Sequence, residues 1–144
     1  MKKIWNLPRV ELASFDDIQE TQPVLLVTSA PAWNAVKASL RGFNIVETIE
    51  VKEATTEYWD SLLTMGNGKS SVVYAVGGGL TADAAKYFAV KLNLPLVVLP
   101  TALSVDAFIT AASGIRRDGC VYYIETKPPE NLILDLDVIA NAPA

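Results

Sequence analysis

Three consecutive glycines, Gly77, Gly78 and Gly79, separate an apolar run at residues 72–76 from an amphipathic helical pattern that extends to Leu92. In a strand, turn and helix of this order, the helix N-terminus offers unpaired N–H groups and a positive dipole end. Glycines leave that backbone open to an anion. The segment therefore predicts a phosphate-binding turn. The alternative is a tight turn that needs a positive φ angle and binds nothing.

The neighbouring sequence alternates between strand and helix signals. Such alternation with short loops predicts a parallel sheet with right-handed crossovers, that is, an α/β fold with a Rossmann-like, mostly parallel sheet flanked by helices. The strands are expected at residues 23–28, 43–51, 72–76 and 96–99, and the helices at residues 31–40 and 55–65 and after the glycines. In the last of these helices a stripe at i, i+4 spacing is expected to face the sheet, namely Leu80, Ala84, Phe88 and Leu92.

Elements that flank this core are also indicated. Residues 8–14 are typical of an edge strand, and Ser14 is placed to cap a brief helix that ends near Glu20. Residues 113–126 predict a β-hairpin that turns at Asp118-Gly119, near the C-terminal end of the chain.

Residues 131–140 are expected to return to the sheet as a final strand, with Asp135 and Asp137 on one face. Such a pair of carboxylates suggests either a metal site or, more simply, a polar strand end. Cys120 is predicted to pack in the hairpin rather than to act as a nucleophile, because the sequence contains no histidine to activate it. The pair Arg116-Arg117 is interpreted as solvated surface.

Composition excludes several classes of protein. The 144 residues suit one domain, and 51% apolar with 19% charged residues argue against disorder. A net charge of −4 without a basic block gives no reason to expect a nucleic-acid partner, and no apolar run approaches the ~18 residues of a membrane span. The single cysteine and the absence of a signal-peptide pattern favour a cytoplasmic location.

A second polar cluster follows the predicted strand at residues 96–99. It contains Thr101, Ser104 and Asp106, with Thr110 one turn further on. Because ligands bind at the carboxyl ends of strands in open α/β sheets, this cluster is expected beside the glycine turn. Hydroxyls bind phosphate or ribose oxygens, and a carboxylate binds diols. Alternatively, Ser104 caps a short helix that begins at Asp106.

Asp83 lies near the start of the helix that follows the glycines. An acid in the first turn stabilises the helix dipole, but it could equally contact an uncharged part of a cofactor. The sequence leaves both interpretations open. The glycine triplet also departs from the G-x-G-x-x-G dinucleotide fingerprint.

Three motifs in series resemble the iron-containing alcohol dehydrogenase superfamily. They are Gly-Gly-Gly-x-x-x-Asp-x-x-Lys at residues 77–86, Pro-Thr-x-x-Ser-x-Asp at residues 100–106, and the segment from Pro-Pro-Glu-Asn to Asn-Ala-Pro at residues 128–143. The superfamily includes glycerol dehydrogenase, sn-glycerol-1-phosphate dehydrogenase and 3-dehydroquinate synthase, and the last motif most resembles glycerol-1-phosphate dehydrogenase. The resemblance extends over this whole chain but over only the N-terminal half of a full-length family enzyme.

The resemblance implies that residues 1–144 form a single nucleotide-binding domain for NAD or NADP, with the pyrophosphate on Gly78 and Gly79 and the substrate against Asp106. Two positions depart from the relatives. Thr28-Ser29-Ala30 stands where many NAD-using members carry an acid for the adenosine ribose, which leaves NADP open. Arg116 stands about where glycerol dehydrogenases carry a tyrosine. The implied cofactor-binding set is Gly77, Gly78, Gly79, Thr81, Asp83, Thr101, Ser104 and Thr110.

In relatives the substrate alkoxide rests on zinc or iron, which an Asp and two His of a helical C-terminal domain hold. The resemblance implies that this domain is absent from residues 1–144, so a metal is expected only in an intact parent enzyme. It also implies an apolar flank that favours self-association. The expected function is therefore the NAD(P)-binding domain of a metal-dependent polyol or polyol phosphate dehydrogenase, inactive by itself. The alternatives are a 3-dehydroquinate-synthase-like NAD-dependent cyclase domain and a non-catalytic nucleotide-binding or interaction domain.

Overall fold

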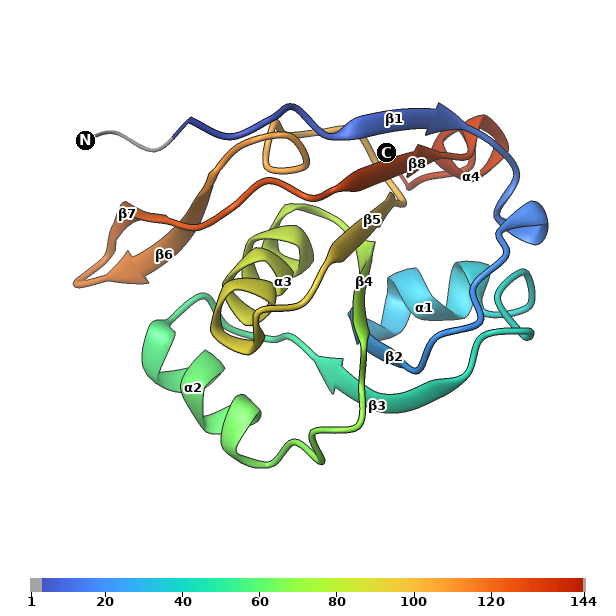
Figure 1. The fold of residues 1–144 in the computed structure, drawn as a ribbon. Coiled ribbons are helices and arrows are strands. Elements are labelled where there is room, and N and C mark those ends of the chain that lie inside the picture. Colours follow the sequence, from blue (N-terminus) through green and yellow to red (C-terminus); the bar gives the residue numbers. More distant parts are fainter. Residues whose placement is uncertain (1–3, 144) are drawn as a thin grey trace.

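A computed structural model describes residues 4–143 (Figure 1). Six strands form one sheet in the order β1-β8-β5-β4-β2-β3, and every neighbouring pair is parallel. The predicted α/β fold with a parallel sheet is therefore confirmed. In chain order the elements are β1 (Arg9–Leu12), the 3-10 helix η1 (Phe15–Asp17), β2 (Val24–Thr28), α1 (Ala30–Val36), β3 (Ile45–Glu50), α2 (Thr56–Thr64), β4 (Val72–Gly77), α3 (Gly79–Leu92), β5 (Leu96–Pro100), β6 (Ala112–Arg117), β7 (Cys120–Glu125), β8 (Asn131–Leu134) and α4 (Leu136–Ala140).

Alternate side chains of the central strands enter two separate hydrophobic clusters. Leu25 of β2 and Val73 of β4 face the cluster that contains Trp59 of α2 and the buried side of α3. Their neighbours in the same strands face the opposite cluster, which contains Val36 of α1. The helix after β2 and the helix after β4 therefore cover opposite faces of the sheet. Open α/β sheets have a ligand crevice where the helices change sides in this way, and here it lies between the ends of β2 and β4.

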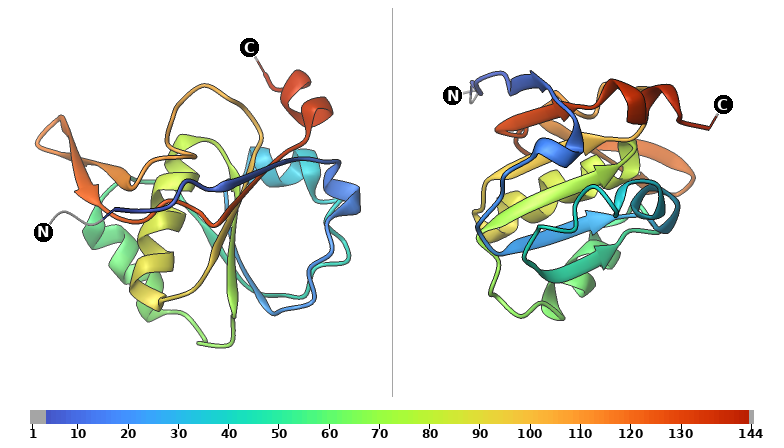
Figure 2. Two further views of the ribbon diagram at one scale, coloured as in Figure 1. Left: turned by 45° about the horizontal axis from the view of Figure 1, so that its top comes forward. Right: turned by 90° about the vertical axis from the view of Figure 1, so that its right-hand side faces the viewer.

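The predicted hairpin is confirmed as a separate two-stranded sheet. β6 and β7 pair antiparallel around the turn at Asp118 and Gly119, both of which have positive φ angles. Figure 2 shows the hairpin reaching out beside α3, away from α1. Ile115 of β6 is buried in the same cluster as α3, so the hairpin is anchored on that helix.

The helix α3 differs from its predicted stripe at both ends. Ala84 and Phe88 are fully buried as expected, but Leu80 and Leu92 are each 39% exposed because both line cavities open to the surface. The buried face instead includes Lys86, which the stripe did not contain and which has no exposed surface.

The final predicted strand is wrong beyond Leu134. β8 ends there, and α4 starts after Asp135. The physical reason is a strong N-cap: the Asp135 carboxylate accepts hydrogen bonds from the backbone N–H groups of Asp137 (3.0 Å) and Val138 (3.3 Å). A third N–H, from Phe15, donates to its other oxygen at 2.8 Å and ties η1 to this corner.

Several other predicted elements are present but shorter, whereas β4 and β5 each extend one residue beyond the predicted strand. The brief helix after Ser14 is the single 3-10 turn η1, whose Asp16 N–H donates to the Ser14 hydroxyl at 3.3 Å. The helix predicted at residues 31–40 ends at Val36 and continues as turns. β1 is an edge strand as expected.

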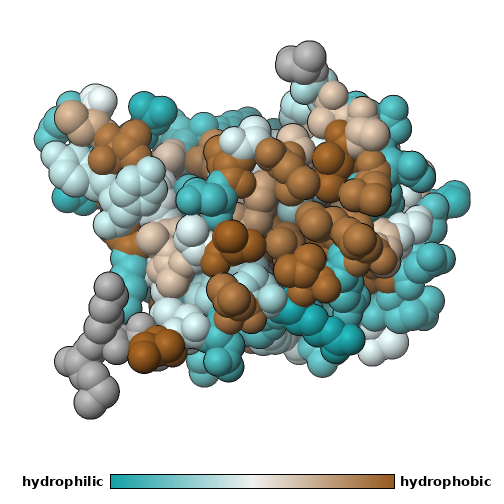
Figure 3. All heavy atoms as spheres, turned by 90° about the horizontal axis from the view of Figure 1, so that it is seen from above, coloured by the Kyte–Doolittle hydropathy of each residue, from teal (hydrophilic) through white to brown (hydrophobic). Residues whose placement is uncertain are grey.

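Apolar side chains gather on the face that carries β1 and α4 (Figure 3). Val10 and Leu12 of β1 are 54% and 68% exposed, and Leu136 of α4 is 60% exposed. This face agrees with the expected apolar flank, and self-association stays a prediction. Within residues 4–143, no helix has the length and apolar character needed to cross a membrane.

Candidate functional site: two cavities beside the glycine turn

The three glycines occupy three different backbone positions. Gly77 ends β4 with φ at +155°, Gly78 is the N-cap of α3 with φ at −99°, and Gly79 is the first helical residue. Only Gly77 therefore needs the conformation that favours glycine. A Cβ atom at Gly77 would lie 2.8 Å from Thr81 Oγ1, so Thr81, which is 3% exposed, packs against the turn itself.

Gly78 and Gly79 leave the start of α3 open on one side. A Cβ atom at Gly78 would meet no atom within 4 Å, whereas one at Gly79 would lie 2.8 Å from Val105 Cγ2. No side chain caps the helix at Gly78. The N-terminus of this 14-residue helix thus presents backbone N–H groups and a positive dipole end to open space.

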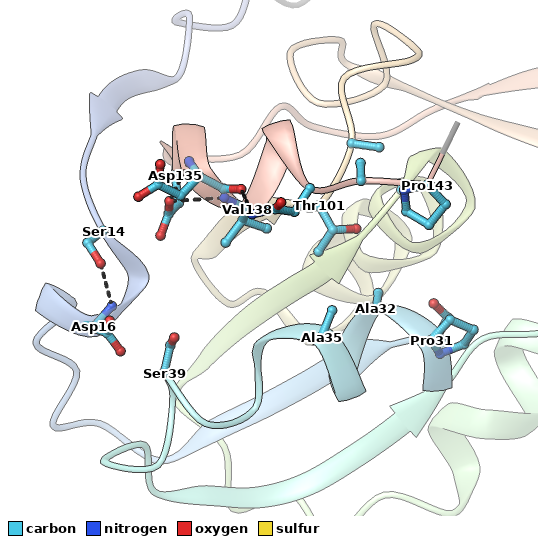
Figure 4. A pocket seen from close by; sticks show the side chains of 16 residues that line it. Ser14, Asp16, Pro31, Ala32, Ala35, Ser39, Thr101, Asp135, Val138 and Pro143 are labelled. Carbon is cyan, nitrogen blue, oxygen red and sulfur yellow. Dashed lines mark hydrogen bonds between the residues drawn. The ribbon is translucent and has the colours of Figure 1, made fainter.

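A cleft of about 560 Å³ lies on the α1 side of this turn. Figure 4 shows it between α1 and α4, and we call it the α1-side cleft. Its size falls within the range of small-molecule sites. As far as the structure describes the chain, the lining holds several hydroxyl groups and three carboxylates but no lysine or arginine. It comprises Ser14, Asp16, Ser29, Pro31, Ala32, Ala35, Ser39, Gly78, Thr101, Ala102, Asp135, Asp137, Val138, Asn141, Ala142 and Pro143.

A smaller cavity of about 280 Å³ lies on the other side of the turn, between α3, the segment after β5 and the hairpin. We call it the α3-side cavity. It brings together four of the predicted residues, Gly79, Asp83, Asp106 and Thr110. It also contains Arg116 and Tyr123, which sequence reasoning did not include in the site. Arg116 is exposed as expected of solvated surface, but the hairpin carries it to the cavity wall.

The two predicted turns lie side by side as expected. The Thr101 N–H donates to the Gly77 carbonyl at 3.1 Å, and Thr101 lines the α1-side cleft. Ser104 is exposed and lines neither cavity. The proposed helix cap at Ser104 is wrong, because residues 104–109 form bends and turns instead of a helix. Asp106 is exposed at the cavity rim.

Asp83 forms an ion pair with Lys86 and does not lie in the first turn of α3, where it would interact with the helix dipole. It is the fifth residue of α3, so the first-turn interpretation is wrong. Its Oδ1 lies 3.3 Å from Lys86 Nζ, and the Gly114 N–H donates to the same carboxylate. Burial raises the pKa of Asp83, against the opposing effect of Lys86. Burial likewise lowers the pKa of Lys86, so desolvation outweighs the mutual attraction of the pair.

Lys86 ends the Gly-Gly-Gly-x-x-x-Asp-x-x-Lys motif at residues 77–86, but sequence reasoning gave it no role in the site. A further signal was its place among the alanines of an otherwise apolar helix face. Two other expectations are corrected: Cys120 is exposed rather than packed, and Asp135 is a helix cap rather than a strand residue. Within residues 4–143, no group of three or more His, Cys, Asp or Glu side chains could hold a metal ion.

The parallel sheet, the helices on both of its faces and the glycine turn at its central crevice define a Rossmann-like α/β domain. The chain belongs to the iron-containing alcohol dehydrogenase family, whose sequence model matches residues 16–143. Glycerol-1-phosphate dehydrogenase [NAD(P)+] of Metallosphaera sedula is 31% identical over 85% of this chain and 36% of the relative. Glycerol dehydrogenase 1 of Schizosaccharomyces pombe is 30% identical over 85% of this chain and 29% of the relative.

Solved structures give the same result. The crystal structure of glycerol dehydrogenase from Schizosaccharomyces pombe matches with a TM-score of 0.82 and 26% identity, over 99% of this chain and 41% of that protein. Sulfoacetaldehyde reductase from Bifidobacterium kashiwanohense, solved in complex with NAD+, has the same fold with a TM-score of 0.80 and 15% identity, over 99% and 49% of the two chains. The chain thus spans less than half the length of these relatives.

Proposed function

We propose that this chain is the NAD(P)-binding domain of a polyol or polyol phosphate dehydrogenase. The observation that carries the proposal is the uncapped N-terminus of α3 at Gly78, which opens into the crevice between the ends of β2 and β4. Backbone N–H groups and the helix dipole there suit a pyrophosphate. The names of the M. sedula and S. pombe relatives agree with this class of activity.

The two cavities suggest how a dinucleotide is divided. The carboxylate of Asp106 can accept hydrogen bonds from a polyol hydroxyl, which supports a substrate position in the α3-side cavity. Hydride transfer needs the nicotinamide beside the substrate, so the nicotinamide half belongs there too. The adenosine half then occupies the larger α1-side cleft, where Ser29 at the end of β2 offers a hydroxyl to the ribose.

The charge of the α1-side cleft favours NAD over NADP. Asp16, Asp135 and Asp137 line it, and among residues 4–143 no cationic side chain does. A 2′-phosphate on the adenosine ribose would add negative charge near these carboxylates without a lysine or arginine to bind it.

The chain alone is proposed to bind the dinucleotide without turning over a substrate. Its described residues do not form a metal site. Asp106 would orient the reacting alcohol, and the glycine turn would fix the cofactor. Catalysis in this proposal needs further residues, as in relatives more than twice as long.

Calorimetric titration with NAD and NADP tests this proposal. Gly78→Val should keep the fold, because φ is −99° and no atom lies near the new side chain, but it should abolish binding by covering the N–H groups. Gly42→Val is the matched control, since a Cβ atom there also meets nothing, and it should bind like the unaltered chain. Equal affinity of all three chains, or no binding by the unaltered chain, would overturn the proposal. Polyol oxidation by this chain with added zinc or iron would contradict the binding-only role.

A further inference from the structure

The Lys86 side chain has no exposed surface, yet its ammonium group has several polar partners. Nζ lies 3.3 Å from Asp83 Oδ1 and donates to the Ala107 carbonyl at 2.8 Å and to Thr110 Oγ1 at 3.1 Å. It also contacts the carbonyl oxygens of Thr110 and Ala112. Three of these partners belong to one short stretch of chain between β5 and β6.

That stretch has little regular structure of its own. Residues 101–111 contain neither a helix nor a strand, although they carry Asp106 and Thr110 to the α3-side cavity. Their other backbone ties include the Ile109 N–H to the Asp106 carbonyl and the Thr126 N–H to the Ala111 carbonyl. A buried ammonium with directed hydrogen bonds to residues 107, 110 and 112 therefore replaces a regular element as the support of this segment.

Asp83, the ion-pair partner of Lys86, is also held by hydrogen bonds. The Asp83 carboxylate accepts from the Gly114 N–H, and the Asp83 carbonyl accepts from the Ser113 hydroxyl at 2.7 Å. The pair thus joins α3, the segment after β5 and the hairpin at one point. An apolar side chain at position 86 would fill the same space without the cost of burying a charge, but it would bind none of these groups.

We infer that Lys86 is a positioning residue, which holds residues 106–112 so that Asp106 and Thr110 face Gly79 and Asp83 across the α3-side cavity. That the α3-side cavity binds the nicotinamide half of the cofactor rests on the proposed function above. The placement of the segment does not depend on that proposal. The partners of Lys86 named above line the α3-side cavity, and none of them lines the α1-side cleft, so its effect is expected at the α3-side cavity.

Amide hydrogen exchange of Lys86→Met, without ligand, tests the inference. Lys91→Met is the control, because Lys91 is an exposed lysine of the same helix. Exchange at residues 106–112 should accelerate by about tenfold or more in Lys86→Met alone, while Gly78 to Ala82 stay unchanged in both variants. Unchanged exchange at residues 106–112 would overturn the inference, as would equal acceleration at both places.

Comparing the affinities for NAD and ADP distinguishes a positioning role from general destabilisation, because general destabilisation would weaken both ligands alike. Lys86→Met should weaken NAD by about tenfold and leave ADP, which lacks the nicotinamide half, unchanged. Equal weakening of both ligands would assign Lys86 a merely structural role. If the unaltered chain binds no NAD, the proposed function fails, and the exchange experiment still decides the role of Lys86.

A milder variant covers the case in which Lys86→Met does not fold. Thr110→Val removes one acceptor of the ammonium and keeps the shape of the side chain. It should show the same selective acceleration at residues 106–112 to a smaller extent. Exchange identical to that of the unaltered chain in Thr110→Val would overturn the inference.

Discussion

The two cavities beside the glycine turn are built in different ways. The α1-side cleft lies where regular elements end, at the carboxyl ends of β2, β4 and β5 and against α1 and α4. The α3-side cavity is closed by an irregular segment and a hairpin, which one buried ion pair joins to α3. The first depends on the hydrophobic pattern of the sheet, and the second depends on a polar contact.

This difference predicts how sensitive each cavity is to substitutions. Apolar burial on both faces of the sheet is spread over many residues, so the strands and α1 beside the α1-side cleft do not depend on a single side chain, and only its α4 corner relies on one residue, Asp135. The α3-side cavity instead depends on two side chains that form a buried ion pair, and removing one of them leaves the other charge without its partner. Substitutions should therefore disturb the α3-side cavity more easily than the α1-side cleft.

The largest expected effect is the loss of the Asp83 carboxylate. Asp83→Ala leaves the buried Lys86 ammonium without its counter-ion and should lower the free energy of unfolding by about 3–5 kcal/mol. Asp106→Ala removes an exposed acid of the same cavity and should change it by less than about 0.5 kcal/mol. Urea denaturation of both variants measures the difference, and equal losses would mean that the ion pair does not support the cavity.

A smaller effect is expected at the glycine turn between the cavities. Gly77→Ala forces a side chain to a φ of +155° and within 2.8 Å of Thr81 Oγ1, which should cost about 1–3 kcal/mol. Gly78→Ala meets neither obstacle and should stay within about 0.5 kcal/mol of the unaltered chain. Thermal melts of the two variants would contradict this account if Gly78→Ala were the less stable one.

On the α1 side, the expected loss is confined to one cap. Asp135→Ala removes the acceptor of two N–H groups of α4 and of the Phe15 N–H, and it should cost about 1–2 kcal/mol. Asp137 is exposed in the same helix, so Asp137→Ala is the control and should cost clearly less. If chemical denaturation finds no difference between the two variants, the Asp135 cap does not stabilise the contact between α4 and η1.

The smallest effect concerns pH. Burial raises the pKa of the Asp83 carboxyl above its ordinary value of 3.8, so the folded chain retains a proton that the unfolded chain has already lost. The stability from this shift is fully present below 3.8 and is lost as pH rises through the folded pKa. The free energy of unfolding of the unaltered chain, minus that of Asp83→Asn, should therefore be larger in mild acid than at neutral pH. A difference that grew with rising pH would show the opposite sign of the shift.

The sequence predicts the sheet well, because continuous apolar runs such as residues 23–28 match strands buried on both faces. It fails where a local polar contact decides the structure. Asp135 ends β8 by capping α4, although its spacing from Asp137 fits a strand. Lys86 lies three residues from Asp83, but its other partners lie more than twenty residues away in the chain, and no local pattern indicates them.

For the candidate site, the sequence indicates two neighbouring turns but not how the cavities beside them are arranged. Both turns and the residues beside them could be named because ligands bind at the carboxyl ends of parallel strands. Their division between two cavities could not, since it depends on how residues 101–111 fold. Tyr123 and Arg116 reach the α3-side cavity only through the register of the hairpin, where Gly114 lies opposite Tyr123.

The most direct test of the central claim is a titration of the chain with NAD, followed by backbone amide chemical shifts. The account predicts the largest changes at the N–H groups of Gly78, Gly79 and Leu80, with further changes in both cavities, at Ser29 on one side and at Asp106 and Thr110 on the other. Changes confined to one cavity would contradict the proposed division of the dinucleotide. An absence of change at Gly78, Gly79 and Leu80 would contradict the glycine turn as the phosphate site.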